Sequence, residues 1–559
     1  MSLPPEQLAG LSPERRILLQ RMLRERAGAD GDPDRVRPRE EGWPAPLSFA
    51  QQRLWLIDRL EPGSTAYIIP APLRLRGRMD TRAMARALTE VARRQESLRT
   101  VFAAEGDEPV QVVLPPAPVP LPLADLRGLP HEARDPELRR LVAEETRRPF
   151  HLERGPLFRV FLARVEEEEW ALLLSMHHAV SDGWSLAVLV RELSALYEAF
   201  ARGEPSPLPE LPVQYADFAV WQRERLSGEA LEAQLGWWRE RLAGAPPVLD
   251  LPTDRPRSAP PGVEAGTHRF LLSEETAAGV RALARAEGAT PFMALLAAWQ
   301  LLLGRYAGSE DVGVGTSVAG RGRKELEGLI GFFVNTLVLR VDLSGDPAVR
   351  ELLGRVRETA LGAFAHQDVP FERLVEELQP ERSLLHSPLF QVMFSLNNLE
   401  GPGKRLGSLE VGAIQANLEA AKFDLGLGLV DADGRLDGSV TYRRALFDAS
   451  TAERMAGHFA RVLAQMAAAP DARISTLDPL TAGEREEVLG WGRGGPAEPG
   501  EETVHGLFAA QAARTPDAVA LVSGPETLTY ADLDRRADVL AALLRERGAG
   551  PEVRVGVCL

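Results

Sequence analysis

Two neighbouring stretches near residue 180 differ in hydrophobic period. Residues 170–176 (WALLLSM) form a short apolar run between acidic and polar residues, which predicts a buried strand. Apolar residues then recur at helical spacing over residues 184–200, which predicts an amphipathic helix: Leu186, Leu189, Val190, Leu193 and Leu196. Residues 177–183 (HHAVSDG) are therefore predicted to form a strand-to-helix loop, a place where folds commonly present reactive groups.

Helical and strand-like patterns alternate along most of the chain, which predicts a mixed α/β (α+β) fold. Two strand-to-helix segments, ADLRG and VDLSG, hint weakly at two related halves. We divide the chain into an N-terminal helix and linker with a possible docking role (1–46), a first lobe (47–222), an interlobe helix and crossover (223–265), a second lobe (266–475), a linker (476–503) and a final α/β fragment (504–559).

Both ends of the chain carry separate patterns. Ser12 and Pro13 can start a helix whose apolar side runs over residues 11–23, before a linker rich in Gly, Asp, Pro and Arg at 28–46. From Val504 onwards the pattern predicts a helix, a strand at 518–522, a turn, a helix at 530–548 and a strand at 553–559. Such a short open unit cannot close a hydrophobic core alone.

Composition narrows the classes of function. The net charge of −15 argues against a nucleic-acid binder, which would carry clustered positive charge. The lone Cys558 cannot build a disulfide framework and fits a reducing compartment. The N-terminus lacks the pattern of a signal peptide, and no apolar run is long enough to span a bilayer. We expect a cytoplasmic protein with no membrane partner.

The residue types of the HHAVSDG loop suit acyl transfer. A histidine titrates near neutrality and can accept a proton from an attacking amine, or orient that amine. Gly183 lets the backbone approach a substrate closely and can aim an N–H group at a developing oxyanion.

Structural interpretations of the same loop compete with the catalytic one. Adjacent histidines point in different directions, so at most one is expected to face substrate. Asp182 could simply cap the following helix. A zinc site is disfavoured, because adjacent histidines do not share a helical face and no thiolate is near.

Six segments, in order, resemble the motifs of the condensation domains of nonribosomal peptide synthetases. They are residues 47–55 (LSFAQQRLW), 94–102 (RQESLRTVF), 176–185 (MHHAVSDGWS), 215–221 (YADFAVW), 330–340 (IGFFVNTLVLR) and 366–372 (HQDVPFE). Gln95 stands where the family usually has His, and residues 382–389 match a seventh motif only loosely. The resemblance covers roughly residues 47–470 and implies two chloramphenicol-acetyltransferase-like lobes in a V-shaped pseudo-dimer, with the active site between them.

The resemblance also assigns roles to residues of the loop. His178 would be catalytic, as general base or as a positioning group, and Gly183 would contribute backbone near the thioester. His177 would be structural, and Asp182 would form a structural ion pair with Arg340. Three residues would line the substrate tunnel: Ser181, Trp184 and Asn335. No metal is expected.

The implied reaction is amide formation between two carrier-bound substrates. An upstream carrier protein would bring an acyl or peptidyl thioester on a 4′-phosphopantetheine arm, and a downstream carrier would bring the aminoacyl thioester whose amine attacks. The ending SDGWS resembles the type that accepts an L-configured donor. Relatives that form heterocycles replace the first His by Asp, and relatives that epimerise are not normally followed by an adenylation domain.

The C-terminal segment resembles the start of an adenylation domain. Residues 528–533 (LTYADL) are similar to its first core motif, but the phosphate loop and later nucleotide motifs are absent from this chain. We therefore expect no bound cofactor and no ATP use here, and we expect the remainder of an adenylation domain as a partner.

Three alternatives stay open. A starter condensation domain would acylate the first amino acid. A coenzyme A-dependent acyltransferase could use the same scaffold, although the adenylation-like tail counts against it. A non-enzymatic docking domain would be expected to have lost His178 or Gly183, and this chain has both.

Overall fold

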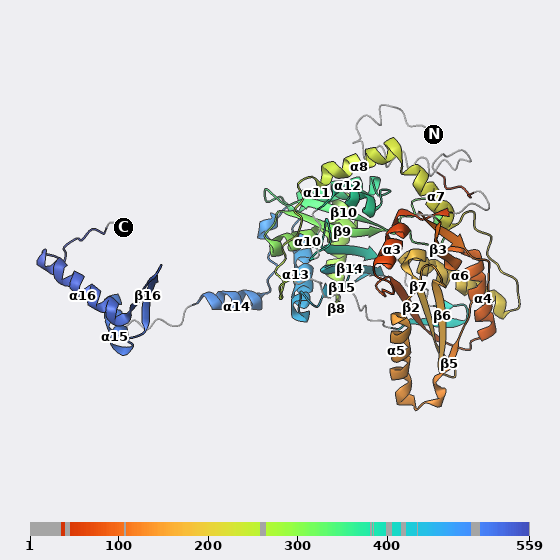
Figure 1. Ribbon diagram of the computed structural model, residues 1–559, viewed down its shortest axis with the longest axis horizontal. Coiled ribbons are helices and arrows are strands. Elements are labelled where there is room, and N and C mark those ends of the chain that lie inside the picture. Colours follow the sequence, from red (N-terminus) through yellow and green to blue (C-terminus); the bar gives the residue numbers. More distant parts are fainter. Residues whose placement is uncertain are drawn as a thin grey trace. The chain divides into compact units, whose positions relative to one another are not determined.

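The computed structural model describes residues 35–39, 45–105, 108–257, 264–380, 383, 385–397, 405–414, 421–432, 434–493 and 503–557. Two compact units make up the chain, Met1–Leu480 and Thr481–Leu559. The first unit holds two six-stranded sheets, each with its own helices (Figure 1). The helix predicted at residues 11–23 lies outside the described residues.

The sheet of the first lobe has the order β12-β13-β2-β7-β6-β5. Its strands are β12 (Arg405–Leu406), β13 (Leu409–Ala413), β2 (Ile68–Arg76), β7 (Glu169–His177), β6 (Phe158–Glu166) and β5 (Leu123–Asp125). The strand predicted at 170–176 is confirmed as β7. Its apolar run is continuous because both of its faces are covered: Leu172 and Leu174 pack with helices α4 (Thr81–Arg94) and α6 (Gly183–Ala201), and Leu173 packs with α5 (His131–Arg147).

Two strands of this sheet come from far along the chain. The β12–β13 hairpin lies within residues 266–475, yet β13 pairs antiparallel with β2, and Val411 lies opposite Leu75. Leu406 and Leu409 are fully buried in the core of the first lobe. The Gly407 N–H also donates to Ser194 Oγ of α6 at 2.9 Å. The hairpin therefore ties the two lobes together.

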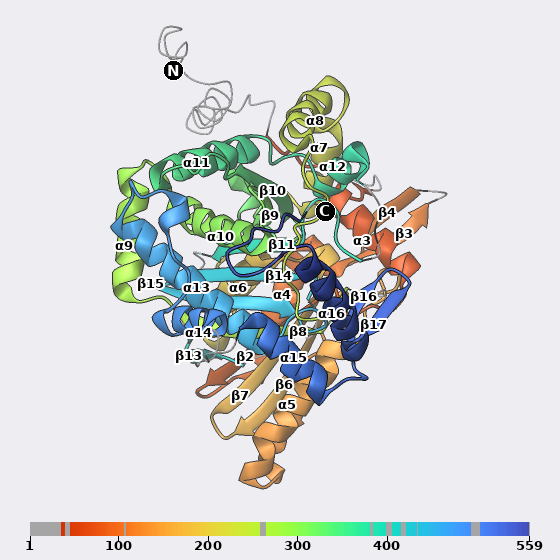
Figure 2. The same cartoon turned by 90° about the vertical axis from the view of Figure 1, so that its left-hand side faces the viewer.

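The sheet of the second lobe has the order β10-β9-β11-β14-β15-β8. Its strands are β10 (Asn335–Asp342), β9 (Asp311–Val318), β11 (Val392–Asn397), β14 (Leu425–Ala432), β15 (Arg435–Arg443) and β8 (Ala265–Leu271). Four helices gather around it (Figure 2): α9 (Glu274–Ala286), α10 (Pro291–Ala307), α11 (Val349–Ala365) and α13 (Ala449–Ala468). Helix α10 is the centre of this core and is capped by Thr290 and by the left-handed Gly308.

Among the described residues, one bent helix pair of the second lobe has the length and composition of a membrane span. Across the described ranges, no single helix is long and apolar enough to cross a membrane. Helices α9 and α10 pass the same test only together, and they are bent by 107° at their junction.

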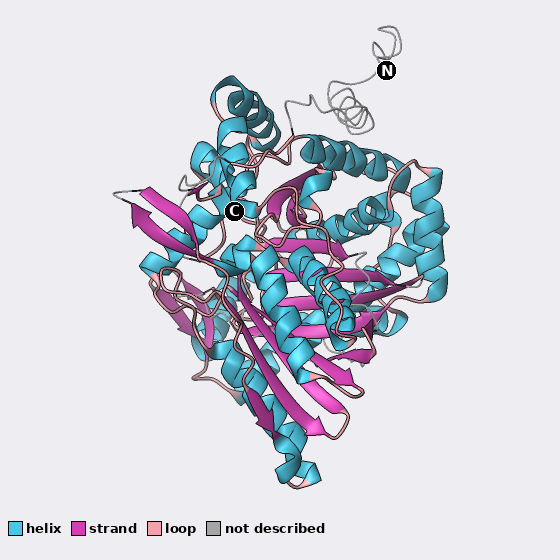
Figure 3. Ribbon diagram, turned by 90° about the vertical axis from the view of Figure 1, so that its right-hand side faces the viewer, coloured by secondary structure: helices cyan, strands magenta, loops and turns pink. Residues whose placement is uncertain are grey.

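Shorter elements join the two lobes, and Figure 3 distinguishes the strands from the helices by colour. A small sheet has the order β1-β4-β3, with β1 (Ala45–Pro46), β4 (Glu108–Val113) and β3 (Thr100–Glu105). The connecting helices are α3 (Phe49–Leu60), α7 (Tyr215–Arg225), α8 (Gly228–Leu242) and α12 (Phe371–Leu378). Ser48 starts α3 with a complete capping box, which explains the sequence SFAQ at that point.

Part of the predicted linker at 28–46 is firmly packed. Val36 is only 1% exposed and lies among apolar residues of α7 and of the loop that follows β9. Its N–H donates to Glu325 at 3.1 Å. Arg39 pairs with Asp217 and Glu96, each at 2.8 Å. A buried valine and a doubly paired arginine fix this segment, and a composition rich in Gly, Pro and charge did not reveal it.

The second unit contains α14 (Ala482–Gly492), α15 (Val504–Arg514), β16 (Val519–Ser523), β17 (Glu526–Thr529) and α16 (Tyr530–Glu546). The predicted helix, strand and second helix are confirmed. Residues 553–557 are not a strand, because no neighbouring strand among the described residues offers hydrogen bonds to them. Helix α14 lies inside the predicted linker and has no buried residue.

Candidate active site

The HHAVSDG loop joins β7 to α6, as its position between the two patterns predicted. A 3₁₀ turn at His178–Val180 follows the strand. Asp182 is the N-cap of α6, and its carboxylate accepts the Ser185 N–H at 2.8 Å. The backbone N–H of His178 donates to the Tyr67 carbonyl at 2.8 Å. The loop is thus held at both ends before any side chain acts on a substrate.

His177 is packed into the first lobe. The residue is 5% exposed, and its Nδ1 accepts the Ala179 N–H at 3.1 Å. Its ring meets the Phe150 ring edge-on, with centroids 6.0 Å apart. Burial lowers the pKa of His177 to about 3, with smaller contributions from the neighbouring His178 and Lys422. A neutral, hydrogen-bonded imidazole in this position suits the structural role expected for it.

His178 has a different environment. Its ring lies against Phe332, with centroids 4.7 Å apart. Its Nδ1 is buried and has no hydrogen-bond partner among the described residues. Burial is the main cause that lowers its pKa to about 4, and Lys422 lowers it further, while Asp182 opposes the shift. The imidazole is therefore neutral near pH 7, with hydrogen-bonding capacity still available.

Asp182 forms a buried ion pair, but its partner is Arg321. Arg321 Nη1 and Nη2 reach the two carboxylate oxygens at 2.8 and 3.1 Å, and the two side chains are at most 1% exposed. The Phe333 N–H donates to the same carboxylate at 3.1 Å. Arg321 also contacts the Phe333 ring, with its guanidinium 4.2 Å from the ring centre. This pair fastens the loop of the first lobe to the segment that connects β9 with β10.

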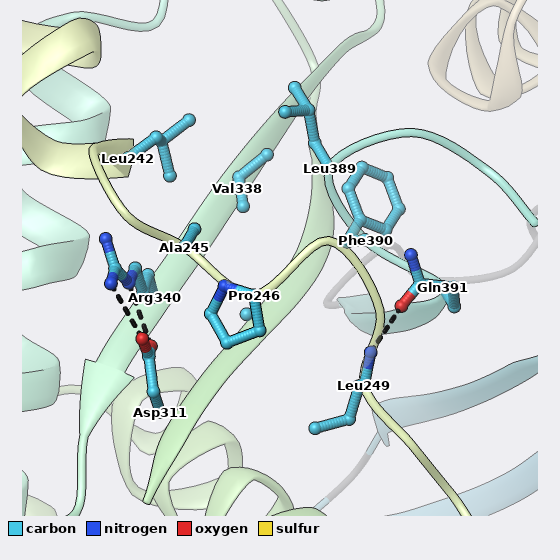
Figure 4. A pocket seen from close by; sticks show the side chains of 11 residues that line it. Leu242, Ala245, Pro246, Leu249, Asp311, Val338, Arg340, Leu389, Phe390 and Gln391 are labelled. Atoms are coloured by element: carbon cyan, nitrogen blue, oxygen red, sulfur yellow. Dashed lines mark hydrogen bonds and ion pairs between the residues drawn. The ribbon is translucent and has the colours of Figure 1, made fainter. Parts of the chain in front are cut away.

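The predicted pairing of Asp182 with Arg340 is wrong. Arg340 lies on β10 and holds Asp311 of β9 through two bonds of 2.8 and 2.7 Å (Figure 4). A third bond, of 2.7 Å, reaches the Ala243 carbonyl, which fixes the crossover that follows α8. The strand register places Arg340 opposite Gly313, on the face that the crossover covers, so its side chain points away from the loop.

Gly183 lies beside open space, whereas the side chains of Trp184 and Ser181 are confined by the protein. A Cβ at Gly183 would meet no atom within 4 Å, so the space beside this residue is open. Trp184 Nε1 donates to the Glu327 carbonyl at 3.0 Å, so the indole is fixed. Ser181 is fully buried, and its hydroxyl has no partner among the described residues.

The side-chain amide of Asn335 is fully hydrogen-bonded within the protein. Its Nδ2 donates to the carbonyls of Gln367 and Val369 at 2.8 and 2.6 Å. Its Oδ1 accepts the N–H groups of Phe371 and Thr336 at 3.0 and 2.8 Å. Direct hydrogen bonding to a substrate would require one of these bonds to break. The residue nonetheless borders a pocket between the lobes, which Phe332 and Pro370 also line.

Gln95, which departs from the family motif, lies away from the loop. Its amide bonds Glu192, the Gly328 carbonyl and the Ile330 N–H at 3.2, 3.0 and 2.9 Å. It therefore joins α6 to the segment after β9, as a buried structural bridge.

Sequence reasoning missed three residues that shape the site: Arg321, Tyr67 and Lys422. Arg321 follows β9 between two glycines, and only the fold shows that it reaches the loop. Lys422 precedes β14, and its ammonium lies 4.9 Å from the centre of the Tyr67 ring.

Comparisons with known proteins agree with this geometry. The chain matches the family described as "Condensation domain" over residues 44–489 and the family described as "AMP-binding enzyme" over residues 508–559. It is 44% identical over 545 residues to chondramide synthase cmdD of Chondromyces crocatus, and the match covers 96% of this chain and 14% of that protein. It is 42% identical over 554 residues to phosphinothricin tripeptide synthetase PhsC of Streptomyces viridochromogenes, and this match covers 99% of this chain and 51% of that protein. Each relative is therefore considerably longer than the chain.

Among solved structures, a complex of the X-domain and OxyB from teicoplanin biosynthesis contains a similar fold. The X-domain match has a TM-score of 0.73 and 32% identity, and it covers 81% of this chain and 100% of that chain.

Proposed function

Residues 44–489 belong to the condensation domain family, and from this premise we propose that the chain forms an amide bond between two carrier-bound substrates. The amine of a carrier-bound aminoacyl group attacks the carbonyl carbon of an upstream acyl or peptidyl thioester. The C–N bond forms, the C–S bond breaks, and the thiol of the donor arm leaves. The observation that carries this proposal is the neutral, incompletely bonded His178 beside the open space at Gly183.

His178 is proposed to act on the amine after attack has begun. A free α-ammonium has a pKa of roughly 8, and an imidazolium pKa of about 4 makes direct deprotonation unfavourable by about 5 kcal/mol. The amine therefore enters uncharged, and the neutral imidazole accepts a hydrogen bond from it. Attack on the carbonyl makes the nitrogen more acidic, so the proton can then pass to His178 and on to the leaving sulfur.

The residues around His178 are proposed to keep it in place. The Nδ1 atom of His177 and the carboxylate of Asp182 are hydrogen-bonded within the protein. Gly183 begins α6, and its open side leaves room for the thioester arm. Removing the Asp182–Arg321 pair should therefore disturb the position of His178 rather than its chemistry.

The substrates are proposed to arrive on 4′-phosphopantetheine arms of two carrier domains, one upstream and one downstream. The AMP-binding segment and the synthetase relatives support this arrangement and a partner adenylation domain. We expect the chain to bind no cofactor and to consume no ATP itself. Elongation and starter roles use the same chemistry at this site.

Carrier dependence can be tested directly. The protein would be mixed with a donor and an acceptor on separate carrier proteins, and the acceptor would be examined by intact-protein mass spectrometry. We expect the acyl mass to move to the acceptor carrier. Equally fast turnover of acyl coenzyme A with a soluble amine would favour the free-standing acyltransferase instead.

The likeness to the X-domain in complex with OxyB gives a docking function one specific support. A docking protein would recruit a partner enzyme and leave both thioesters intact in this assay.

A further inference from the structure

One charged residue near the loop has no role in the chemistry described so far. Only three of the 65 Lys and Arg residues in the sequence are lysine, and Lys422 is one of them. Its positive charge acts on both histidines of the HHAVSDG loop, since it contributes to lowering the pKa of His177 and of His178.

The backbone of Lys422 is anchored in the second lobe. The neighbouring Asp424 is 2% exposed and pairs with Arg257 and Arg443 at 2.5 and 3.5 Å. Arg443 also donates to the Lys422 carbonyl at 3.5 Å. This cluster fixes the backbone of Lys422, and its one carboxylate, that of Asp424, is paired with the two arginines.

The side chain of Lys422 reaches the first lobe. Its ammonium lies 4.9 Å from the centre of the Tyr67 ring, and the Tyr67 carbonyl accepts the backbone N–H of His178. No carboxylate of the described residues forms an ion pair with Lys422. An ammonium held by an aromatic face, with no counterion, remains available for negative charge that develops nearby.

We propose that the Lys422 ammonium belongs to the acyl-transfer site and stabilises the oxyanion of the tetrahedral intermediate. Attack of the amine turns the thioester carbonyl oxygen into an oxyanion, so a fixed positive charge there favours the intermediate over the substrates. Lys422 comes from the second lobe and His178 from the first, so the charge is in place only when the lobes are together. This inference rests on the proposed function.

The surrounding charges agree with this role. Solvent reaches the lysine residue, but protein crowds its ammonium, and this desolvation lowers the pKa of Lys422 to about 8, with help from Arg53. Arg53 of α3 is itself paired with Glu372 of α12 at 3.0 Å. Around His178, the other titratable groups are the neutral His177 and Asp182, whose carboxylate is paired with Arg321. Lys422 is therefore the unpaired charge of this group that can lose its proton near pH 8.

The test compares Lys422→Met with Lys422→Arg in the full chain. Amide formation would be followed with a panel of N-acetylaminoacyl pantetheine donors and aminoacyl pantetheine acceptors, using the pair that the parent protein converts fastest. We expect Lys422→Met to lower kcat on the order of 10- to 100-fold with little change in KM, because the charge acts on the intermediate. Lys422→Arg should recover most of that loss.

The pH profile separates this role from a structural one. The parent protein should lose activity as pH rises through about 8, where Lys422 loses its proton. Lys422→Arg should move this loss beyond pH 10, because arginine stays charged. The titration of the acceptor amine is common to both proteins and cancels in their ratio. The comparison of the parent protein with Lys422→Arg therefore tests the role of the Lys422 charge even if Lys422→Met fails to fold.

Two results would overturn the inference. One is a Lys422→Met protein with the parent kcat and pH profile, and the other is an Arg variant as inactive as the Met variant at an unchanged melting temperature. A His178→Ala control keeps the two proposals apart. If His178→Ala is inactive while Lys422→Met is fully active, only the role of Lys422 fails; if His178→Ala is fully active, the proposed function fails.

Discussion

The buried pair of Asp182 and Arg321 offers a quantitative test of how the loop is held. In an Arg321→Ala protein, the Asp182 carboxylate stays in the interior without its cation, since both side chains are at most 1% exposed. Breaking one side of a buried pair costs about 3–5 kcal/mol. The matched control is Arg340→Ala. The pair of Arg340 and Asp311 is 20% and 31% exposed, and Arg340 also bonds the Ala243 carbonyl, so we expect a loss of only about 1–2 kcal/mol.

Both variants would be measured by urea unfolding followed by tryptophan fluorescence. The double variant Asp182→Ala, Arg321→Ala should be less destabilised than the sum of its single variants, because neither charge is left alone. The reasoning is refuted if Arg340→Ala destabilises the protein as much as Arg321→Ala does. It is also refuted if the double variant shows no coupling between the two residues.

Three further predictions follow from the same region. Gly183→Val should keep the parent melting temperature but lose most amide formation, because the added side chain fills the open space beside the loop. Gly331→Ala should instead unfold readily, because its Cβ would lie 2.0 Å from the Tyr215 ring. Equal stability of the two variants would contradict this contrast. Tyr215→Phe should cost about 1–2 kcal/mol in urea unfolding, because its hydroxyl donates to the Phe332 carbonyl at 2.7 Å, and a loss below a few tenths would count against it. The free energy of unfolding should fall as pH drops from about 6.5 towards 4, because the unfolded chain protonates the His178 imidazole and the folded protein keeps it neutral. His178→Ala should reduce the slope of this free energy against pH by about 1.4 kcal/mol per pH unit. An unchanged slope would contradict a lowered pKa of His178 in the folded protein.

Local features of the site could be predicted from the sequence. The change of hydrophobic period at residue 177 located the end of β7, the loop and the start of α6. Asp182 stands two residues before the predicted helix at 184–200, and aspartate is a preferred N-cap residue, so its role as a cap has a local cause. These predictions succeeded because neighbours in sequence determine them.

Features that depend on distant contacts could not be predicted in this way. Arg321 follows β9 and Arg340 lies on β10, and only the folded chain shows that Arg321 is the one that reaches Asp182. The β12–β13 hairpin carries a short strand-like pattern that does not say which sheet it joins. Val36 is a lone apolar residue in a polar segment, and its pocket is assembled from residues far along the chain.

The role of Lys422 lay beyond local patterns for the same reason. Nothing beside it in the sequence indicates that its ammonium meets Tyr67 across the lobes. The rarity of lysine in this chain was the one available signal, and it gains meaning only once the fold brings the residue to the site.

The central claim is that His178 carries out chemistry that His177 only supports. It is tested most directly by single-turnover amide formation between two carrier-bound thioesters, comparing the parent protein with His178→Ala at pH 7.5. We predict a correctly folded variant whose rate is lower by a factor of about 100 or more, in the range that general base catalysis contributes. A His178→Ala protein that forms the amide at the parent rate would contradict the account.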